Sequence, residues 1–163
     1  MADIIYSVLT FEGDGFSMRR LKRKYFNLFG RIDFNKVIPT GKNDDCYLLW
    51  GSPSNALGTY VIDGRSIRIQ TEWSVPKPTF AELSRQIPDV YIGVEWADSN
   101  DIYGGNNGRY VLHGGDDITR VWQPPRPPIG RLDLLNEFAQ HVCWGASFEY
   151  DDMIRIYGLD MSN

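Results

Sequence analysis

Two acidic side chains are the first candidates for catalytic chemistry. Glu72 and Glu95 each precede a tryptophan near the end of a predicted strand, and paired carboxylates can act as general acid and general base. The predicted strand order puts one strand between them, so their carboxylates would lie roughly 9–10 Å apart, near the wide end of the range for inverting glycosidases. Nothing else in the sequence indicates glycoside chemistry, and two solvated glutamates are the simpler interpretation.

The histidines and cysteines do not form a recognisable metal or nucleophile motif. Cys46 and Cys143 are too few for a disulfide scaffold or an iron–sulfur cluster. His141 and Cys143 stand two residues apart, which points them to different sides of a helix, and zinc would need two more ligands. No nucleophile elbow, phosphate-binding loop or dinucleotide motif occurs. We therefore predict no metal, no cofactor and no catalytic residue, with an enzyme of unrecognised class kept as an alternative.

A dense group of cations is the clearest electrostatic feature. Five basic residues occupy six consecutive positions: Arg19, Arg20, Lys22, Arg23 and Lys24. On a chain of net charge −4 they give a local positive potential that can attract phosphates or an acidic protein. The net negative charge argues against a general nucleic-acid coat. The alternative to a binding role is a solvated helix face.

Composition indicates one ordinary globular domain. The 163 residues are 42% hydrophobic and 23% charged. No apolar run approaches the roughly 18 residues of a membrane span, and the start lacks the basic region of a secretory signal. We expect a cytoplasmic protein with no membrane partner.

Hydrophobic periodicity predicts an antiparallel sheet with two helices. The expected strands are residues 4–11, 46–50, 59–62, 67–73 and 90–96, and the expected helices are residues 18–29 and 79–86. Asp63-Gly64 is a strong hairpin signal. Taken with the two hairpin strands at 59–62 and 67–73, and leaving aside the short run at 46–50, the order strand, helix, strand, strand, helix, strand predicts an α+β fold, the ferredoxin-like split βαβ sandwich with both helices on one face.

The first predicted helix should bury one side. Its apolar residues recur at helical spacing at Leu21, Tyr25, Leu28 and Phe29. Gly30 is a plausible residue to follow the helix end.

The opposite face of the sheet is predicted to be covered by the C-terminal region. This face would carry Tyr6, Thr10, Arg68, Gln70, Glu72, Tyr91 and Glu95. RNA-recognition modules stack bases on such a face, but the glutamates here would repel phosphate.

The C-terminal part is predicted as an appendage. We divide the chain into a domain at residues 1–123, a stiff proline-rich linker at 124–128 and a helix–hairpin appendage at 129–163 packed on the domain. Two short strands are expected at residues 109–113 and 118–122, a helix at 132–142 and a hairpin within 148–157. The loop before them, residues 104–108, is glycine-rich, and we include Tyr103, Asn106 and Asn107 among the partner-binding candidates.

Four segments carry a resemblance to a known family. Residues 32–39 read Ile-Asp-Phe-Asn-Lys-Val-Ile-Pro, 50–52 read Trp-Gly-Ser, 55–56 read Asn-Ala, and 71–76 read Thr-Glu-Trp-Ser-Val-Pro. Over about residues 11–116 the chain resembles the YubB family of plasmid- and phage-borne proteins. The resemblance implies a ferredoxin-like fold and a mobile-element setting, and it implies no particular activity. The chain departs from the family at residues 52–54, where a bulkier segment with a second Trp is usual, and at Glu72, where a small residue is common.

The family-like residues define a candidate pocket. It would be formed by Trp50, Asn55, Glu72 and Trp73 with the connector at residues 33–36. A structural account is the alternative, in which both tryptophans pack beneath the sheet edge and Asn55 hydrogen-bonds the backbone of a turn.

These observations predict a non-catalytic accessory protein of a phage or plasmid. It would bind a host or phage protein, for example to inhibit a host defence system, through the basic helix or the loop near Tyr103. The alternatives are nucleic-acid binding through the basic helix and an enzyme of unrecognised class. The oligomeric state stays open.

Overall fold

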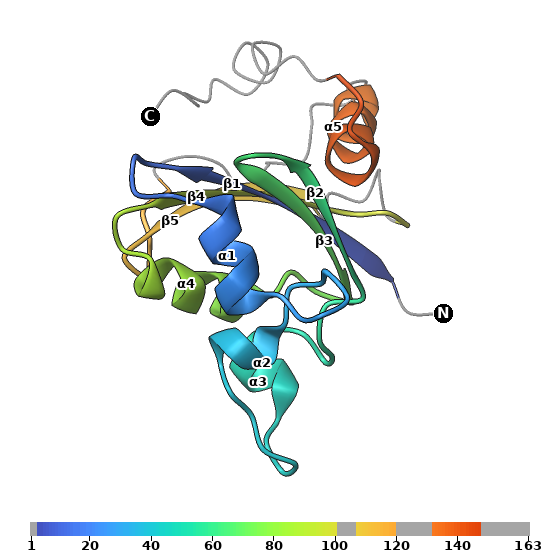
Figure 1. The fold of residues 1–163 in the computed structure, drawn as a ribbon. Coiled ribbons are helices and arrows are strands. Elements are labelled where there is room, and N and C mark those ends of the chain that lie inside the picture. The colour runs from blue at the N-terminus through green and yellow to red at the C-terminus, as the bar shows by residue number, and fades with distance from the viewer. Residues whose placement is uncertain (1–2, 101–106, 120–131, 148–163) are drawn as a thin grey trace.

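The computed structural model describes residues 3–100, 107–119 and 132–147 (Figure 1). This part of the chain contains six strands and five helices. The strands are β1 (Ile4–Glu12), β2 (Gly58–Asp63), β3 (Ser66–Glu72), β4 (Tyr91–Asp98), β5 (Asn107–His113) and β6 (Asp116–Asp117). The helices are α1 (Met18–Tyr25), α2 (Phe34–Val37), α3 (Cys46–Trp50), α4 (Lys77–Gln86) and α5 (Leu132–Trp144).

All six strands form one antiparallel sheet in the order β2-β3-β1-β4-β5-β6. The central strand β1 pairs with β3 on one side and β4 on the other, so that Leu9 lies opposite both Ile67 and Val94. Helices α1 and α4 lie on one side of the sheet, and α5 lies on the other (Figure 1).

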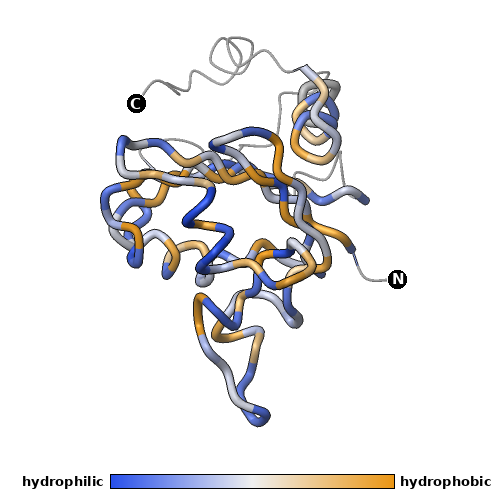
Figure 2. Tube along the Cα trace, viewed as in Figure 1, coloured by the Kyte–Doolittle hydropathy of each residue, from blue (hydrophilic) through white to orange (hydrophobic). Residues whose placement is uncertain are grey.

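The main core lies between the sheet and helices α1 and α4. The alternation of β3 puts Ile67, Ile69 and Thr71 on the buried face, all with no exposed surface. Helix α4 contributes Phe80 and Leu83, which are also fully buried, as the sequence predicted. Figure 2 shows orange hydrophobic stretches along the strands, whereas most of α1 is blue because its exposed side is basic.

Helix α5 packs on the other face of the sheet. Its buried residues Phe138, Ala139 and Val142 lie over β1 and β4, whose Val8 and Ala97 are buried from this side. The backbone of the helix is also held by β3, because the Arg68 Nε donates to the Val142 carbonyl at 2.8 Å. The helix therefore covers part of the face that the strand alternation left polar.

The first predicted helix ends earlier than expected. It stops at Tyr25, and Leu28 and Phe29 are fully exposed instead of buried. Asn27 causes the early end, because its side-chain Oδ1 accepts from the backbone N–H groups of Phe29 and Arg31 and so offers the chain a turn in place of another helical turn. The prediction that Gly30 follows the helix end was wrong.

The segment at residues 46–50 is the helix α3 and not the predicted strand. The Asp45 carboxylate accepts from the backbone N–H groups of Tyr47 and Leu48, which caps the helix N-terminus. Gly51 ends it with a left-handed φ of 77°. A short apolar run fits either element by periodicity, and here the flanking caps decide.

The remaining elements follow the predicted pattern, with shifted ends. The β2–β3 hairpin forms as expected, and its turn residues are Gly64 and Arg65, between the paired Asp63 and Ser66. The last short strand lies at Asp116–Asp117 and not at residues 118–122, where the described residues 118 and 119 are outside any strand. The proline-rich linker at 124–128 and the predicted hairpin within 148–157 lie outside the described residues.

Candidate binding surface

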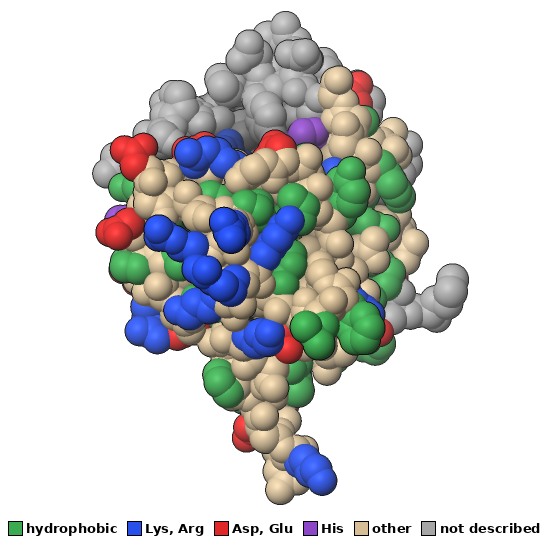
Figure 3. All heavy atoms as spheres, in the orientation of Figure 1, with side chains coloured by type: hydrophobic (Ala, Val, Ile, Leu, Met, Phe, Trp, Pro, Cys, Tyr) green, Lys and Arg blue, Asp and Glu red, His purple; other side chains and the backbone are tan. Residues whose placement is uncertain are grey.

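Helix α1 presents its cations to solvent. Leu21 and Tyr25 are four residues apart and both buried, so the helix packs through this stripe and turns the rest of its surface outward. We call the exposed set the α1 basic face: Arg19, Arg20, Lys22, Arg23 and Lys24. Figure 3 shows the corresponding blue cluster at the position of α1.

The α1 basic face is not neutralised from within the described part of the protein. None of the ion pairs between described residues involves one of its five side chains. Among the five, and within the described residues, Lys24 alone lies over an aromatic ring, with its Nζ 5.3 Å from the centroid of the Tyr25 ring. The cations are therefore available to an external anion.

The helix carries its charges at some cost to its own stability. Arg19 and Arg23 are spaced i,i+4, as are Arg20 and Lys24, and like charges at this spacing repel. No acidic residue occupies the first turn, where one would interact favourably with the helix dipole. Lys22, Arg23 and Lys24 in the last turn are favourable for the same dipole. If the face served only solubility, charges of both signs would keep the helix soluble and make it more stable.

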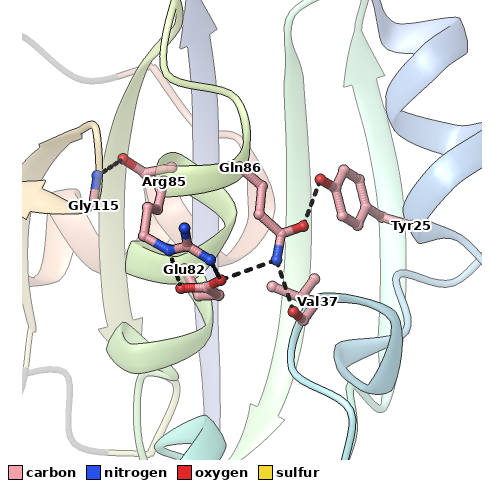
Figure 4. Close-up of polar contacts among 7 residues, drawn as sticks. Tyr25, Val37, Glu82, Arg85, Gln86 and Gly115 are labelled. Carbon is pink, nitrogen blue, oxygen red and sulfur yellow. Dashed lines mark hydrogen bonds and ion pairs between the residues drawn. The ribbon is translucent and has the colours of Figure 1, made fainter.

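A hydrogen-bonded network holds α1 in place. The Tyr25 hydroxyl donates to Gln86 Oε1 of α4 at 2.8 Å, and Gln86 Nε2 donates to the Val37 carbonyl at the end of α2 at 2.9 Å (Figure 4). Glu82 accepts from the same Gln86 amide at 3.1 Å, and its pKa is lowered, chiefly by the hydrogen bond from Arg85. One glutamine thus ties α1, α2 and α4 together, which fixes the direction of the basic face.

Carboxylates border the basic face near the start of α1. Glu12, Asp14 and Asp89 are all exposed. Asp89 belongs to the same neighbourhood, since a Cβ at Gly15 would lie 3.6 Å from the Asp89 Cβ. Figure 3 likewise shows red side chains beside the blue cluster. The positive surface is consequently compact.

A tight turn follows α1 directly. The Asn27 N–H donates to the Arg31 carbonyl at 2.8 Å and the Gly30 N–H donates to the Asn27 carbonyl at 3.2 Å, while Phe26 and Ile32 form a β-bridge across the base. Gly30 has a φ of 77°, so the segment matches a three-residue hairpin loop closed by a left-handed glycine. We call residues 27–31 the Leu28–Phe29 turn.

Sequence reasoning missed this turn, although a signal was present. Asn at the first position and Gly at the fourth, as in Asn27-Leu28-Phe29-Gly30, are favoured turn residues. The helical spacing of Leu28 and Phe29 outweighed that signal in the prediction.

Two of the candidate pocket residues are part of the internal structure. Trp50 is 6% exposed, its Nε1 donates to the Ile38 carbonyl at 2.9 Å, and its ring packs edge-on against Phe34. The Asn55 Oδ1 accepts from the N–H groups of Phe34 and Ala56, each at 2.9 Å, and its Nδ2 donates to Asp33 at 2.8 Å. The structure brings Asn55 to the connector, where it contacts the backbone of Phe34 and the cap residue Asp33.

The other two candidate pocket residues lie at the end of β3. Trp73 is 66% exposed, so the predicted packing of this ring beneath the sheet edge was wrong. Its backbone forms a strained turn with φ 70°, in which the Ser74 N–H donates to the Glu72 carbonyl at 2.8 Å. The Trp73 N–H also donates to the Asp3 carbonyl, and Ser74 Oγ donates to the Gly51 carbonyl at 2.5 Å.

The two glutamates are farther apart than the sequence suggested. The β1 register places Glu72 opposite Ile4 and Glu95 opposite Val8. Four residues along a strand correspond to about 13 Å, in addition to the distance across β1. This corrects the expected separation of 9–10 Å, and the pair does not form a carboxylate dyad.

Glu95 instead faces α5. Its Oε1 lies 3.7 Å from His141 Nε2, and the other ring nitrogen of His141 lies 2.8 Å from the Ala146 carbonyl. The pKa of His141 is raised, mainly by its interaction with Glu95 and against the effects of burial and of Arg68. Cys143 is buried, and burial raises the pKa of its thiol to about 12, so it is not an activated nucleophile.

The loop candidates are only partly within the described residues. Tyr103 and Asn106 lie outside them. Asn107 begins β5 and is 3% exposed, so its side chain is buried and is not part of an exposed loop.

No group of three or more potential metal-ligating side chains is found in the described ranges. Within the same ranges, no helix has the length and apolar character needed to cross a membrane. Comparisons with protein-family models, curated proteins and solved structures found no match to this chain. The YubB resemblance therefore stays a prediction.

Proposed function

We propose that the chain is a ferredoxin-like, non-catalytic binding module that holds an acidic protein on the α1 basic face. The observation that carries the proposal is the set of five exposed cations without an ion-pair partner in the described residues. The structure gives them a fixed direction through Tyr25 and Gln86.

The strand order supports the ferredoxin-like assignment. The strands β2-β3-β1-β4 are adjacent in this order, with α1 following the first strand and α4 following the third. Figure 1 draws both helices on the same side of the sheet. On this assignment β5, β6 and α5 are additions, with α5 on the face that the split βαβ unit leaves open.

The charge pattern supports binding over a merely solvated helix. The face has two repelling i,i+4 pairs and no first-turn acid, both of which lower helix stability. Natural proteins commonly give up stability where function requires it. A binding role accounts for this choice of residues, whereas solubility alone does not.

The compactness of the face favours a protein partner over an extended polyanion. A nucleic-acid duplex is longer than α1, so its phosphates would also lie close to Glu12, Asp14 and Asp89 at the N-terminal end of the helix. Charges act over roughly 8 Å at physiological ionic strength, so these neighbours would repel phosphates close to them. A local acidic patch on a protein can match the face without covering its border.

The mobile-element setting is a further part of the proposal. It rests on the resemblance of residues 32–39, 50–52, 55–56 and 71–76 to the YubB family. In that setting the partner is a host or phage protein, and inhibition of a host defence system is the role we propose.

The proposal can be tested by capture from a nuclease-treated bacterial lysate. The tagged wild-type protein is compared with a variant reversed at Arg19, Arg20, Arg23 and Lys24, each to Glu. We expect a protein of low isoelectric point to be retained by the wild type and reduced at least tenfold with the variant. Equal retention by both proteins would refute the role of α1.

Nucleic acid is the second candidate for the same face. Its signature is capture that disappears with nuclease, and binding to a DNA duplex that falls steeply with salt because counterions are released. Retention that survives nuclease excludes it.

A further inference from the structure

The Leu28–Phe29 turn exposes two large apolar side chains. Leu28 is 102% exposed and Phe29 is 85% exposed, more than any other large hydrophobic residue in the described part of the chain. Exposed single hydrophobic residues are common, but two adjacent ones at the tip of a turn are not explained by packing.

The turn is rigid. The Asn27 Oδ1 accepts from the N–H groups of Phe29 at 2.9 Å and Arg31 at 3.1 Å, in addition to the two backbone hydrogen bonds across the loop. It is tied to the start of β2 and the residue before it, since the Ile32 N–H donates to Thr59 Oγ1 and the Arg31 Nη1 donates to the Leu57 carbonyl, each at 3.1 Å. Its two apolar side chains are thus presented at low entropic cost to a partner.

The fold does not require apolar residues at this tip. The turn geometry depends on Asn27 at its first position and on Gly30, whose φ is 77°. Leu28 and Phe29 are exposed and do not belong to the core cluster. Polar residues would fit the same backbone, so a role outside the fold accounts for Leu and Phe better than a role within it.

Cations stand on both sides of the apolar pair. Lys24 precedes it in the last turn of α1, and Arg31 closes the turn, and both are exposed. We propose that Leu28 and Phe29 are the apolar anchor of the α1 basic face, and that the partner is a protein with an apolar pocket bordered by carboxylates. This inference rests on the proposed function and names the chemistry of its partner.

The side chains favour a protein pocket over other anionic surfaces. Leu28 is aliphatic and has no ring to stack on a nucleic-acid base, whereas an apolar pocket buries it as readily as Phe29. An anionic bilayer is as extended as a duplex and would also meet the border of Glu12, Asp14 and Asp89. Interfaces commonly combine a buried aromatic or aliphatic anchor with a charged rim.

The test places a photo-crosslinker at the tip. The full chain carries p-benzoylphenylalanine at position 29, where it replaces a similar aromatic ring, and is irradiated in a nuclease-treated bacterial lysate. The control carries the same group at position 60, because Tyr60 is 62% exposed and pairs with Arg68 on the α5 side of the sheet. We expect at least tenfold more product from position 29, with the crosslink mapped to apolar residues beside Asp or Glu of one protein.

Three results would overturn the inference: equal products at both positions, no product at position 29, or a product made only with lipid or nucleic acid. Anionic vesicles of 70% phosphatidylcholine and 30% phosphatidylglycerol and a 20-base-pair duplex are tested as separate probes. Binding to either that Leu28→Ser/Phe29→Ser abolishes would assign the anchor to that surface instead.

Capture from lysate without the crosslinker distinguishes failure of this inference from failure of the proposed function. Leu28→Ser/Phe29→Ser should retain the urea unfolding midpoint of the wild type and lose at least tenfold in partner retained. If the fourfold charge reversal abolishes capture and the serine variant does not, the anchor is wrong and the basic face stands. If neither variant changes capture, both proposals fail.

Discussion

Two neighbouring segments of the chain differ in how their side chains are used. Around Asn55, the side chains form hydrogen bonds and contacts inside the protein. From α1 to Arg31, the cations and two apolar residues face solvent. In the first segment the side chains of Trp50 and Asn55 account for the local fold, and the binding candidates lie in the second.

The contrast gives a rule for separating structural from functional residues in this chain. Trp50 and Asn55 are explained fully by what they contact, since each satisfies backbone groups of the α2 region. The α1 basic face and the Leu28–Phe29 turn have no such explanation, because the fold would tolerate other residues there. The substitutions of Trp50, Asn55 and Arg20 each test one side of this contrast.

The largest difference in the free energy of unfolding is expected between variants of Trp50 and of Trp73. Trp50→Ala should lower the free energy of unfolding by about 3–5 kcal/mol, because it removes a buried ring packed against Phe34. Trp73→Ala should lower it by less than about 1 kcal/mol, since that ring is mostly exposed. Urea unfolding monitored by circular dichroism measures both. Similar losses would show that the exposed tryptophan also has a structural role.

The second largest change in stability is expected at Asn55, whose side chain forms the hydrogen bonds of the same segment. Asn55→Ala should lower the free energy of unfolding by about 2 kcal/mol, because it leaves the N–H groups of Phe34 and Ala56 without their acceptor. Asn43→Ala is the matched control at an exposed position and should change it by less than about 0.5 kcal/mol. Equal urea midpoints for the two variants would contradict the structural account of Asn55.

A smaller, pH-dependent effect is expected where α5 meets the sheet. The His141 pKa is raised by Glu95, so the stabilisation is fully present below the ordinary histidine pKa and is lost as pH rises through the folded-state value. The contribution should be below about 1 kcal/mol, because both partners retain solvent contact.

The difference in unfolding free energy between wild type and His141→Gln, measured from pH 5 to 9, isolates this contribution. It should favour the wild type at acidic pH and shrink toward alkaline pH. A difference that is constant or grows with pH would mean that Glu95 does not pair with protonated His141.

The smallest effect has the opposite sign. Arg20→Glu should raise the free energy of unfolding by about 0.3–1 kcal/mol. It places an acid at the third helical position after the cap Ser17 and replaces the repulsion with Lys24 by attraction. Lys22→Glu makes the same charge change in the last turn, where an acid opposes the dipole, and should not stabilise. A loss of stability in Arg20→Glu would show that the basic face serves the fold.

The sequence predicted the elements whose periodicity and turn signals agree. The β2–β3 hairpin has alternating Ile67 and Ile69 and an Asp-Gly turn, and α4 has Phe80 and Leu83 at helical spacing after prolines. The α1 basic face was also readable, because Leu21 and Tyr25 fix the buried stripe and leave the cations outside.

The failures arose where a side chain competes with the pattern. Asn27 stops α1 before Leu28, and Asp45 starts a helix where an apolar run suggested a strand. The exposed position of Trp73 depends on its positive φ, which the alternation of β3 does not predict. The Leu28–Phe29 turn was missed for the first of these reasons, although Asn27-x-x-Gly30 indicated it.

The most direct test of the account is capture from nuclease-treated lysate with Arg20→Glu beside the wild type. Because this variant should be at least as stable as the wild type, lost binding cannot be attributed to unfolding. The account predicts that the retained acidic protein falls several-fold, while Trp73→Ala retains it fully. Undiminished capture by Arg20→Glu would contradict the claim that α1 is the binding surface.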